Sequence, residues 1–178
     1  MTKNVSSIDI LHYELLRSNI NNFIKDIAEL YDKKDMLLLD VAPQDHEGAK
    51  MYFKKSKIET LDIDPNSEAD YIADLCKNNI EIIENNKFDA ILLSEVLEHT
   101  LQPFEAISEI YRILKYGGYL FLTVPFNFRI HGPLPDCWRF TEHGLRELLK
   151  NFDIIKLNVL EDNERFLMPI AYTIIAQK

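Results

Sequence analysis

Five polar residues of this sequence stand directly after apolar stretches, where they could meet in space and bind a ligand. The apolar stretches predict buried parallel strands. The carboxyl ends of such strands gather at one edge of the sheet, and open α/β sheets bind their ligands there. Carboxylates at that edge can accept hydrogen bonds from two neighbouring hydroxyl groups. The five residues are Asp40, Asp62, Asp74, Ser94 and Glu95.

Asp62 is the most specific of these candidates. It follows Asp40 at close to the spacing of about 20 residues that leads to the ribose-binding acid in dinucleotide folds. Asp64 competes for the same position. Asp62, Asp64 and Asp70 can also be explained as turn-forming residues, so the spacing leaves both interpretations open.

A second polar group lies in the irregular run 125–140, whose three prolines exclude regular structure. A loop of this length in a compact domain is usually functional or mobile. His131 and Asp136 are the predicted catalytic bases, and Trp138 offers a flat platform for a sugar or aromatic ring. Arg139 is a predicted anion clamp. Alternatively, Trp138 and Arg139 anchor the loop to the sheet, with Asp136 paired to Arg139.

Strands and helices alternate along the chain and position these groups. Apolar residues at helical spacing predict that the N-terminal segment 1–35 is an amphipathic helix. Gly117 and Gly118 are predicted to end a later helix, and Thr141 is predicted to cap another. The remaining predictions are short helical stretches at 47–53 and 80–83 and strands at 36–41, 57–63, 71–73, 90–93, 119–124, 152–159 and 170–176.

This order predicts an α/β fold, a Rossmann-like three-layer sandwich with a mostly parallel seven-stranded sheet. No helix fits between the last two strands, so they should pair as a C-terminal antiparallel hairpin. The absence of repeats and linkers predicts one domain over residues 1–178.

Composition narrows the classes of partner. The formal net charge of -9 argues against nucleic acid and anionic membranes, because both would repel the chain. Cys76 and Cys137 lack metal-site spacing, and the acidic clusters lack the spacing of a calcium loop, so no metal is predicted. The N-terminus lacks the apolar core of a signal peptide, and no run reaches membrane-spanning length, so we expect a cytoplasmic protein.

Two consecutive stretches carry a family resemblance. Residues 88–99 read FDAILLSEVLEH, and residues 111–125 read YRILKYGGYLFLTVP. They resemble the second half of class I S-adenosylmethionine-dependent methyltransferases of the type 11 kind, which read roughly FDxVxxxxVLEH…RxLKPGGxLxxxVP. The resemblance implies S-adenosylmethionine as cofactor and the strand order 3-2-1-4-5-7-6.

The resemblance also assigns roles to the strand-end residues. Asp40 would face the methionine amino group, although an acid there can instead cap buried loop amides. The Asp74-Leu75 pair would flank the adenine, and Ser94 and Glu95 would lie beneath the sulfonium. The predicted cofactor contacts are Asp40, Ala42, Asp62, Ile63, Asp74, Leu75, Ser94 and Glu95.

The loop after the first strand departs from this family. Family members carry three alternating glycines there, because glycine lets the backbone approach the cofactor. This chain has Ala42, Gln44 and His46 in those places, and Pro43 removes one backbone donor. Either the loop takes another course and still admits the cofactor, with Gly48 serving in it, or the site is closed.

The run from His131 to Leu145 resembles a segment of a family subset that reads roughly HxxPxDYWRxTxxGLxxLL. The subset implies a small-molecule or glycan-related partner, so we expect methyl transfer to a small-molecule or saccharide-like acceptor. The alternative is a catalytically inactive protein of the same fold that binds or regulates a partner. A nicotinamide-dependent oxidoreductase is disfavoured, because GxGxxG is absent. The oligomeric state stays open, with a homodimer as one alternative.

Overall fold

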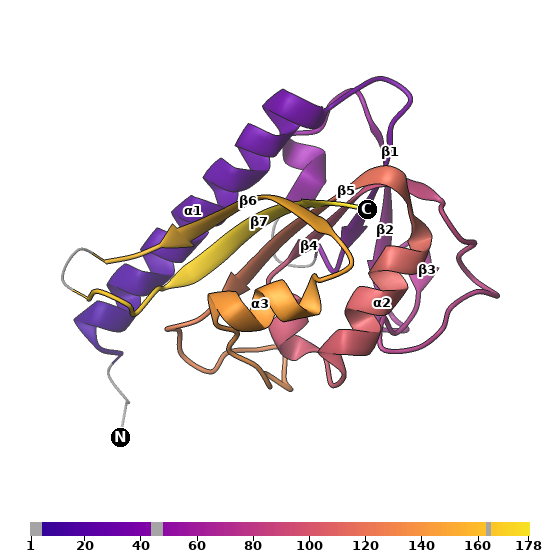
Figure 1. Ribbon diagram of the computed structural model, residues 1–178. Coiled ribbons are helices and arrows are strands. Elements are labelled where there is room, and N and C mark those ends of the chain that lie inside the picture. The colour runs from indigo at the N-terminus through magenta and orange to yellow at the C-terminus, as the bar shows by residue number, and fades with distance from the viewer. Residues whose placement is uncertain (1–4, 44–47, 163–164) are drawn as a thin grey trace.

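A seven-stranded sheet forms the centre of the computed structural model, which describes residues 5–43, 48–162 and 165–178 (Figure 1). The strand order β3-β2-β1-β4-β5-β7-β6 confirms the prediction. The first five strands in sequence run parallel, and β7 is antiparallel to both β5 and β6. The strands are β1 (Leu37–Val41), β2 (Lys57–Asp62), β3 (Tyr71–Ile72), β4 (Phe88–Ser94), β5 (Leu114–Pro125), β6 (Asp153–Leu160) and β7 (Ala171–Gln177).

Helices cover both faces of the sheet, which confirms the three-layer sandwich (Figure 1). One face packs against α1 (Ser7–Tyr31), and the other packs against α2 (Pro103–Ile113) and α3 (Glu142–Leu148). The Thr141 side chain accepts a hydrogen bond from the Gly144 amide, so the predicted cap of α3 is confirmed. Two short 3₁₀ helices, η1 (Gly48–Met51) and η2 (Leu97–His99), follow β1 and β4.

The central position of β4 explains why its residues 90–93 are all apolar. Successive side chains point to opposite faces of a strand. Ala90 and Leu92 therefore pack on the α1 side, while Ile91 and Leu93 pack on the side of α2 and α3. All four side chains are completely buried, so only the end of the strand can present polar groups to a ligand.

Two local predictions were wrong. Residues 80–83 form a turn instead of a helix. The predicted stop at Gly117 and Gly118 is also misplaced, because α2 ends at Ile113 and β5 begins at the next residue. The glycines lie inside β5 where its register with β4 shifts, and Gly117 has a φ of +77°, which glycine adopts without strain.

Two apolar side chains that lie at helical spacing with core residues are largely exposed. Leu30 is 69% and Phe104 is 60% exposed. His12, one helical turn before Leu16, is buried, and its Nδ1 lies 3.3 Å from the Asn127 carbonyl oxygen. The segment after β5 therefore covers this part of α1. Within the described ranges, no helix combines the length and the apolar character needed to cross a membrane.

Candidate functional site

Two adjacent cavities lie at the carboxyl ends of β1, β2 and β4. The larger has a volume of about 400 Å³ and the smaller about 200 Å³. Of the predicted cofactor contacts, Asp74 and Leu75 line the larger, while Ser94 and Glu95 line the smaller. The residues that line both cavities are Ala42, Asp62, Ile63, Val96 and His99.

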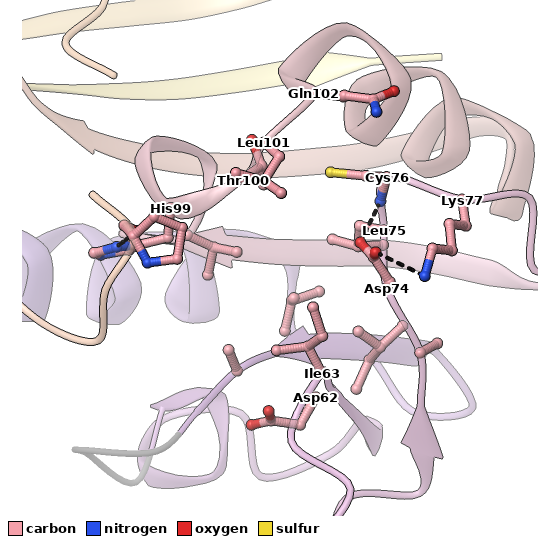
Figure 2. Close-up of a pocket in the computed structure, with 16 residues that line it drawn as sticks. Asp62, Ile63, Asp74, Leu75, Cys76, Lys77, His99, Thr100, Leu101 and Gln102 are labelled. Carbon is pink, nitrogen blue, oxygen red and sulfur yellow. Dashed lines mark hydrogen bonds and ion pairs between the residues drawn. The ribbon is translucent and has the colours of Figure 1, made fainter. Parts of the chain in front are cut away.

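Three of the segments that border the larger cavity are labelled in Figure 2. Asp62 and Ile63 lie at the end of β2, residues 74–77 follow β3, and residues 99–102 run on from the last residue of η2. The Asp74 carboxylate accepts a hydrogen bond from the Cys76 amide at 2.9 Å, which fixes the turn after β3. An apolar pocket with a few oriented polar groups is typical of a cofactor site.

Asp62 is held in place at the border of the larger cavity. It is only 1% exposed, and its Oδ1 accepts a hydrogen bond from the Asp64 amide at 2.8 Å. Asp64 itself is exposed and accepts a bond from the Asn66 amide, and it is not among the residues that line the two cavities. Asp70 accepts bonds from the Thr60 amide and hydroxyl. The geometry therefore favours Asp62 over Asp64 for a ligand contact.

Asp40 turns toward the loop rather than toward the described cavities. Its Oδ2 accepts a hydrogen bond from the Ala49 amide at 2.7 Å, which is the loop-capping alternative. Burial raises the pKa of the Asp40 carboxyl to about 6. Sequence reasoning left both roles open for Asp40, and the described residues support the one in which its carboxylate holds the loop that follows β1.

The altered loop uses left-handed backbone at both of its described ends. Ala42 has a φ of 51° and donates its amide to the Leu61 carbonyl at 2.8 Å. Gly48 has a φ of +52°, and a Cβ on it would lie 2.2 Å from Asp40 Oδ2. Gly48 thus supplies a close backbone approach that only glycine permits. The predicted glycine-slot residues Gln44 and His46 lie outside the described residues.

Beyond β4 the chain carries two glutamates: Glu98 is completely buried, and Glu95 is partly buried with its Oε2 atom shielded from solvent. Glu95 has a φ of 54°, and its Oε1 accepts a hydrogen bond from the Thr123 hydroxyl at 2.9 Å. Burial raises the pKa of Glu95 to about 7. Burial, together with the nearby Glu95, raises the pKa of Glu98 well above its ordinary range. Sequence reasoning missed Glu98, although it follows the same strand end as Glu95.

The loop 125–140 is fixed by its own side chains. Arg139 forms a two-pronged ion pair with Asp136, at 2.5 and 2.7 Å, and donates to the Arg129 carbonyl at 3.0 Å. Burial opposes ionisation of Asp136, but the bonds from Arg139 outweigh it and hold the pKa at about 2. Trp138 Nε1 donates to the Thr100 carbonyl at 2.8 Å. This is the anchoring arrangement left open as the alternative.

The two predicted bases are placed differently. His131 lines the smaller cavity, and burial lowers its pKa although Asp136 opposes the shift. Asp136 accepts the His131 amide at 2.9 Å and is not among the residues that line the two cavities. The Nδ1 atom of His99 lies 2.9 Å from the Pro135 carbonyl oxygen, so His99 contacts the loop 125–140. His99 also lines both cavities.

A family model described as a methyltransferase domain matches residues 21–122, more than half of the 178-residue chain. The chain belongs to this methyltransferase family. The predicted class I S-adenosylmethionine-dependent methyltransferase family is thereby confirmed. No curated protein matches the chain.

Solved structures share the methyltransferase fold at low sequence identity. A SAM-dependent methyltransferase from Methanosarcina mazei is 20% identical, with a TM-score of 0.64 over 85% of this chain and 96% of its own. The 1,6-didemethyltoxoflavin-N1-methyltransferase of Burkholderia thailandensis, with bound S-adenosylhomocysteine, is 13% identical, with a TM-score of 0.63 over 100% and 93%. The [4+2]-cyclase SpnF is 17% identical, with a TM-score of 0.69 over 89% and 81%. With the family match, these structures support S-adenosylmethionine as the cofactor.

Replacing Gly48 by alanine should destabilise the methyltransferase domain. The left-handed backbone costs alanine about 1–2 kcal/mol, and the new Cβ would collide with Asp40, so we expect a loss of at least about 2 kcal/mol. Urea denaturation measures it. Gly144→Ala is the matched control, because a Cβ there lies 3.6 Å from Thr141 Oγ1 and a helical alanine gains roughly 0.5–1 kcal/mol. Equal effects of both substitutions would contradict the role of Gly48.

Asp40→Asn should change stability in a pH-dependent way. A folded-state pKa of about 6 lies above the ordinary value of about 3.9, so Asp40 stabilises fully below about pH 4, and this contribution is lost as the pH rises through 6. Asparagine keeps the acceptor for Ala49 but never ionises. We expect little difference from the wild type near pH 4 and a gain of up to about 3 kcal/mol near pH 8. A difference that does not vary with pH, measured by urea denaturation, would rule this out.

Proposed function

We propose that the protein transfers a methyl group from S-adenosylmethionine to a small-molecule or saccharide-like acceptor. One observation carries the proposal: two cavities of different character meet at the strand ends and share Asp62 and His99. The larger suits a nucleoside, and the smaller suits a compact acceptor. A donor and an acceptor held in adjacent pockets react as if in one molecule, and this effect can lower the barrier by several kcal/mol.

The larger cavity offers the groups that an adenosine moiety requires. Asp62 would accept hydrogen bonds from the ribose hydroxyls, and the apolar side chains of Ile63 and Leu75 would flank the adenine ring. Ala42 borders both cavities, so the described beginning of the altered loop leaves room beside it. When bound, S-adenosylmethionine supplies a methyl group on a positively charged sulfur. These fits favour the interpretation that the loop admits the cofactor.

The smaller cavity combines polar and aromatic groups from distant segments. Tyr13 and Arg17 of α1 form one side, and Glu95 and His131 form another. The His131 Nδ1 lies 3.2 Å from the Arg129 carbonyl oxygen, so the neutral ring carries its proton there and leaves Nε2 as the basic atom. His131 would then remove a proton from the acceptor, and Asp136 would orient the loop that carries His131 instead of acting as a second base.

The alternative is that the protein has this fold but either has no catalytic activity or catalyses a different reaction. The altered loop between Ala42 and Gly48 favours it, and one solved structure of the same fold is named as a [4+2]-cyclase. A fold does not determine a function. The two functions differ in one measurable respect, because only a methyltransferase forms S-adenosylhomocysteine from S-adenosylmethionine when an acceptor is present.

Asp62→Ala should weaken binding of S-adenosylhomocysteine by about 2–4 kcal/mol, since two charge-assisted hydrogen bonds would be lost. Calorimetric titration of the wild type should show one site for S-adenosylhomocysteine and none for NAD. Asp64→Ala is the control and should leave the affinity unchanged. Failure of the wild type to bind S-adenosylhomocysteine at millimolar concentration would reject the proposed function, and equal affinity in folded Asp62→Ala would reject the role of Asp62.

His131→Ala should lower turnover by about 10²–10⁴ if His131 is the base, while affinity for S-adenosylhomocysteine stays close to that of the wild type. Release of S-adenosylhomocysteine, measured with a panel of small hydroxyl, amine and saccharide acceptors, reports turnover. His143→Ala removes an exposed histidine of α3 and serves as the control. Unchanged turnover in His131→Ala would exclude the base.

A further inference from the structure

Glu98, His99 and His131 bring three metal-binding atoms together at the edge of the smaller cavity. One ligand atom from each residue lies within 4.8 Å of the other two. Glu98 Oε1 lies 3.7 Å from His99 Nε2 and 3.7 Å from His131 Nε2. Glu98 and His99 belong to η2, whereas His131 comes from the loop 125–140, so the cluster joins the two segments that close the site.

The Glu98 carboxylate has no adequate partner within the described part of the chain. Its side chain is 0% exposed, and neither carboxylate oxygen has a hydrogen bond there. A separation of 3.7 Å from each imidazole is too long for a hydrogen bond. Carboxylates buried this deeply are normally paired, hydrogen-bonded or bound to a metal.

The two imidazoles are oriented so that their free lone pairs face Glu98. His99 Nδ1 lies 2.9 Å from the Pro135 carbonyl, and His131 Nδ1 lies 3.2 Å from the Arg129 carbonyl. A carbonyl only accepts, so in the neutral rings both Nδ1 atoms carry the proton and both Nε2 atoms are unprotonated. Metal-binding histidines are held by the same kind of bond from the second ring nitrogen.

The spacing also suits a metal ion. Bonds of about 2.0–2.1 Å in tetrahedral geometry separate neighbouring ligand atoms by roughly 3.4 Å. The two separations from Glu98 Oε1 are 3.7 Å and all three atoms lie within 4.8 Å of one another, so side-chain rotations would have to bring them closer around an ion. Two imidazoles and one carboxylate are the ligand set of many catalytic zinc and non-haem iron sites, which keep further positions open.

We propose that Glu98, His99 and His131 bind one divalent transition-metal ion of the zinc class beside the smaller cavity. Magnesium and calcium prefer oxygen ligands throughout, so two imidazoles disfavour them. The open positions of the ion would face the cavity that His99 and His131 line. If the proposed function holds, an oxygen of the acceptor would occupy one of them.

The charges around the cluster support a cation. Glu95 is a second buried carboxylate, and its Oε2 also has no hydrogen bond within the described ranges. The positive groups that face the pair are Arg17 and Arg139, and Arg139 is already engaged by Asp136. A divalent ion would offset the repulsion between Glu95 and Glu98 and would bind the Glu98 carboxylate, which forms no ion pair with either arginine.

The competing explanation is a purely structural cluster. The Glu98 backbone carbonyl accepts the amides of Cys137 and Trp138 at 2.8 and 3.2 Å, so η2 anchors the loop without any metal. In that case the imidazole Nε2 atoms bind no ion, and that of His131 stays available as the base. One lone pair cannot hold a metal and accept a proton together, so His131 cannot act as the base while it binds the ion.

The test is a metal titration of the full chain without cofactor, after treatment with a chelator. Zinc binding is followed by calorimetry, and Co²⁺ is used as a coloured substitute whose visible absorption bands report nitrogen and oxygen ligands. We expect one ion per chain. Glu98→Gln keeps the side-chain volume and should raise the dissociation constant at least tenfold, since loss of an outer partner alone costs about 10–100-fold. His131→Asn should do the same, and His143→Ala should match the wild type.

The absence of saturable binding by the wild type, or equal dissociation constants in the wild type, Glu98→Gln and His131→Asn, would overturn the metal site. Circular dichroism checks that each variant is folded. If Glu98→Gln is unfolded, the comparison of His131→Asn with His143→Ala decides. Because no cofactor is present, a failed metal titration leaves the proposed methyl transfer intact, and a failed S-adenosylhomocysteine titration leaves the metal site intact.

Discussion

The burial of Glu95 and Glu98 just beyond β4 is the electrostatic constraint around which this site is arranged. Carboxylates removed from water are unstable unless charges or hydrogen bonds replace the lost solvation. Here the Thr123 hydroxyl and the neighbouring Arg139 stabilise Glu95 in part, while Glu98 keeps both oxygens without a hydrogen bond in the described chain. A fold retains such a cost at a place where a ligand can offset it.

The loop 125–140 depends on the same region. Its backbone is fixed to the Glu98 carbonyl through Cys137 and Trp138, and the ion pair between Asp136 and Arg139 closes it internally. These hydrogen bonds and this ion pair therefore fix the loop that positions His131 beside the cavity. The ion pair with Arg139 makes Asp136 a weak base. Of the two predicted bases, His131 lines the cavity and Asp136 holds the loop.

The altered loop that stands in place of the usual glycine motif also changes the surroundings of Asp40. Gly48, at the far end of the altered run, makes the close approach to Asp40, and Ala42 takes left-handed backbone at the near end. Asp40 is thereby committed to the Ala49 amide. In the proposed binding mode, the adenosine end of the cofactor would lie beside Asp62 and Leu75.

The sequence by itself determined the sheet order, the antiparallel hairpin, the family and the strand ends at Asp62, Asp74 and Glu95. The hairpin and the strand ends follow from local periodicity and from polar residues that end apolar runs, which are properties of neighbouring residues. The family and the sheet order follow from the resemblance of residues 88–99 and 111–125 to known methyltransferases. Only the tertiary structure decided that Asp40 holds the loop, that Glu98 is buried and that His99 meets His131. The role of Asp40 depends on how the chain returns to it at Ala49. The other two facts depend on how the loop 125–140 packs over η2, and no local pattern encodes the distance between segments far apart in the chain.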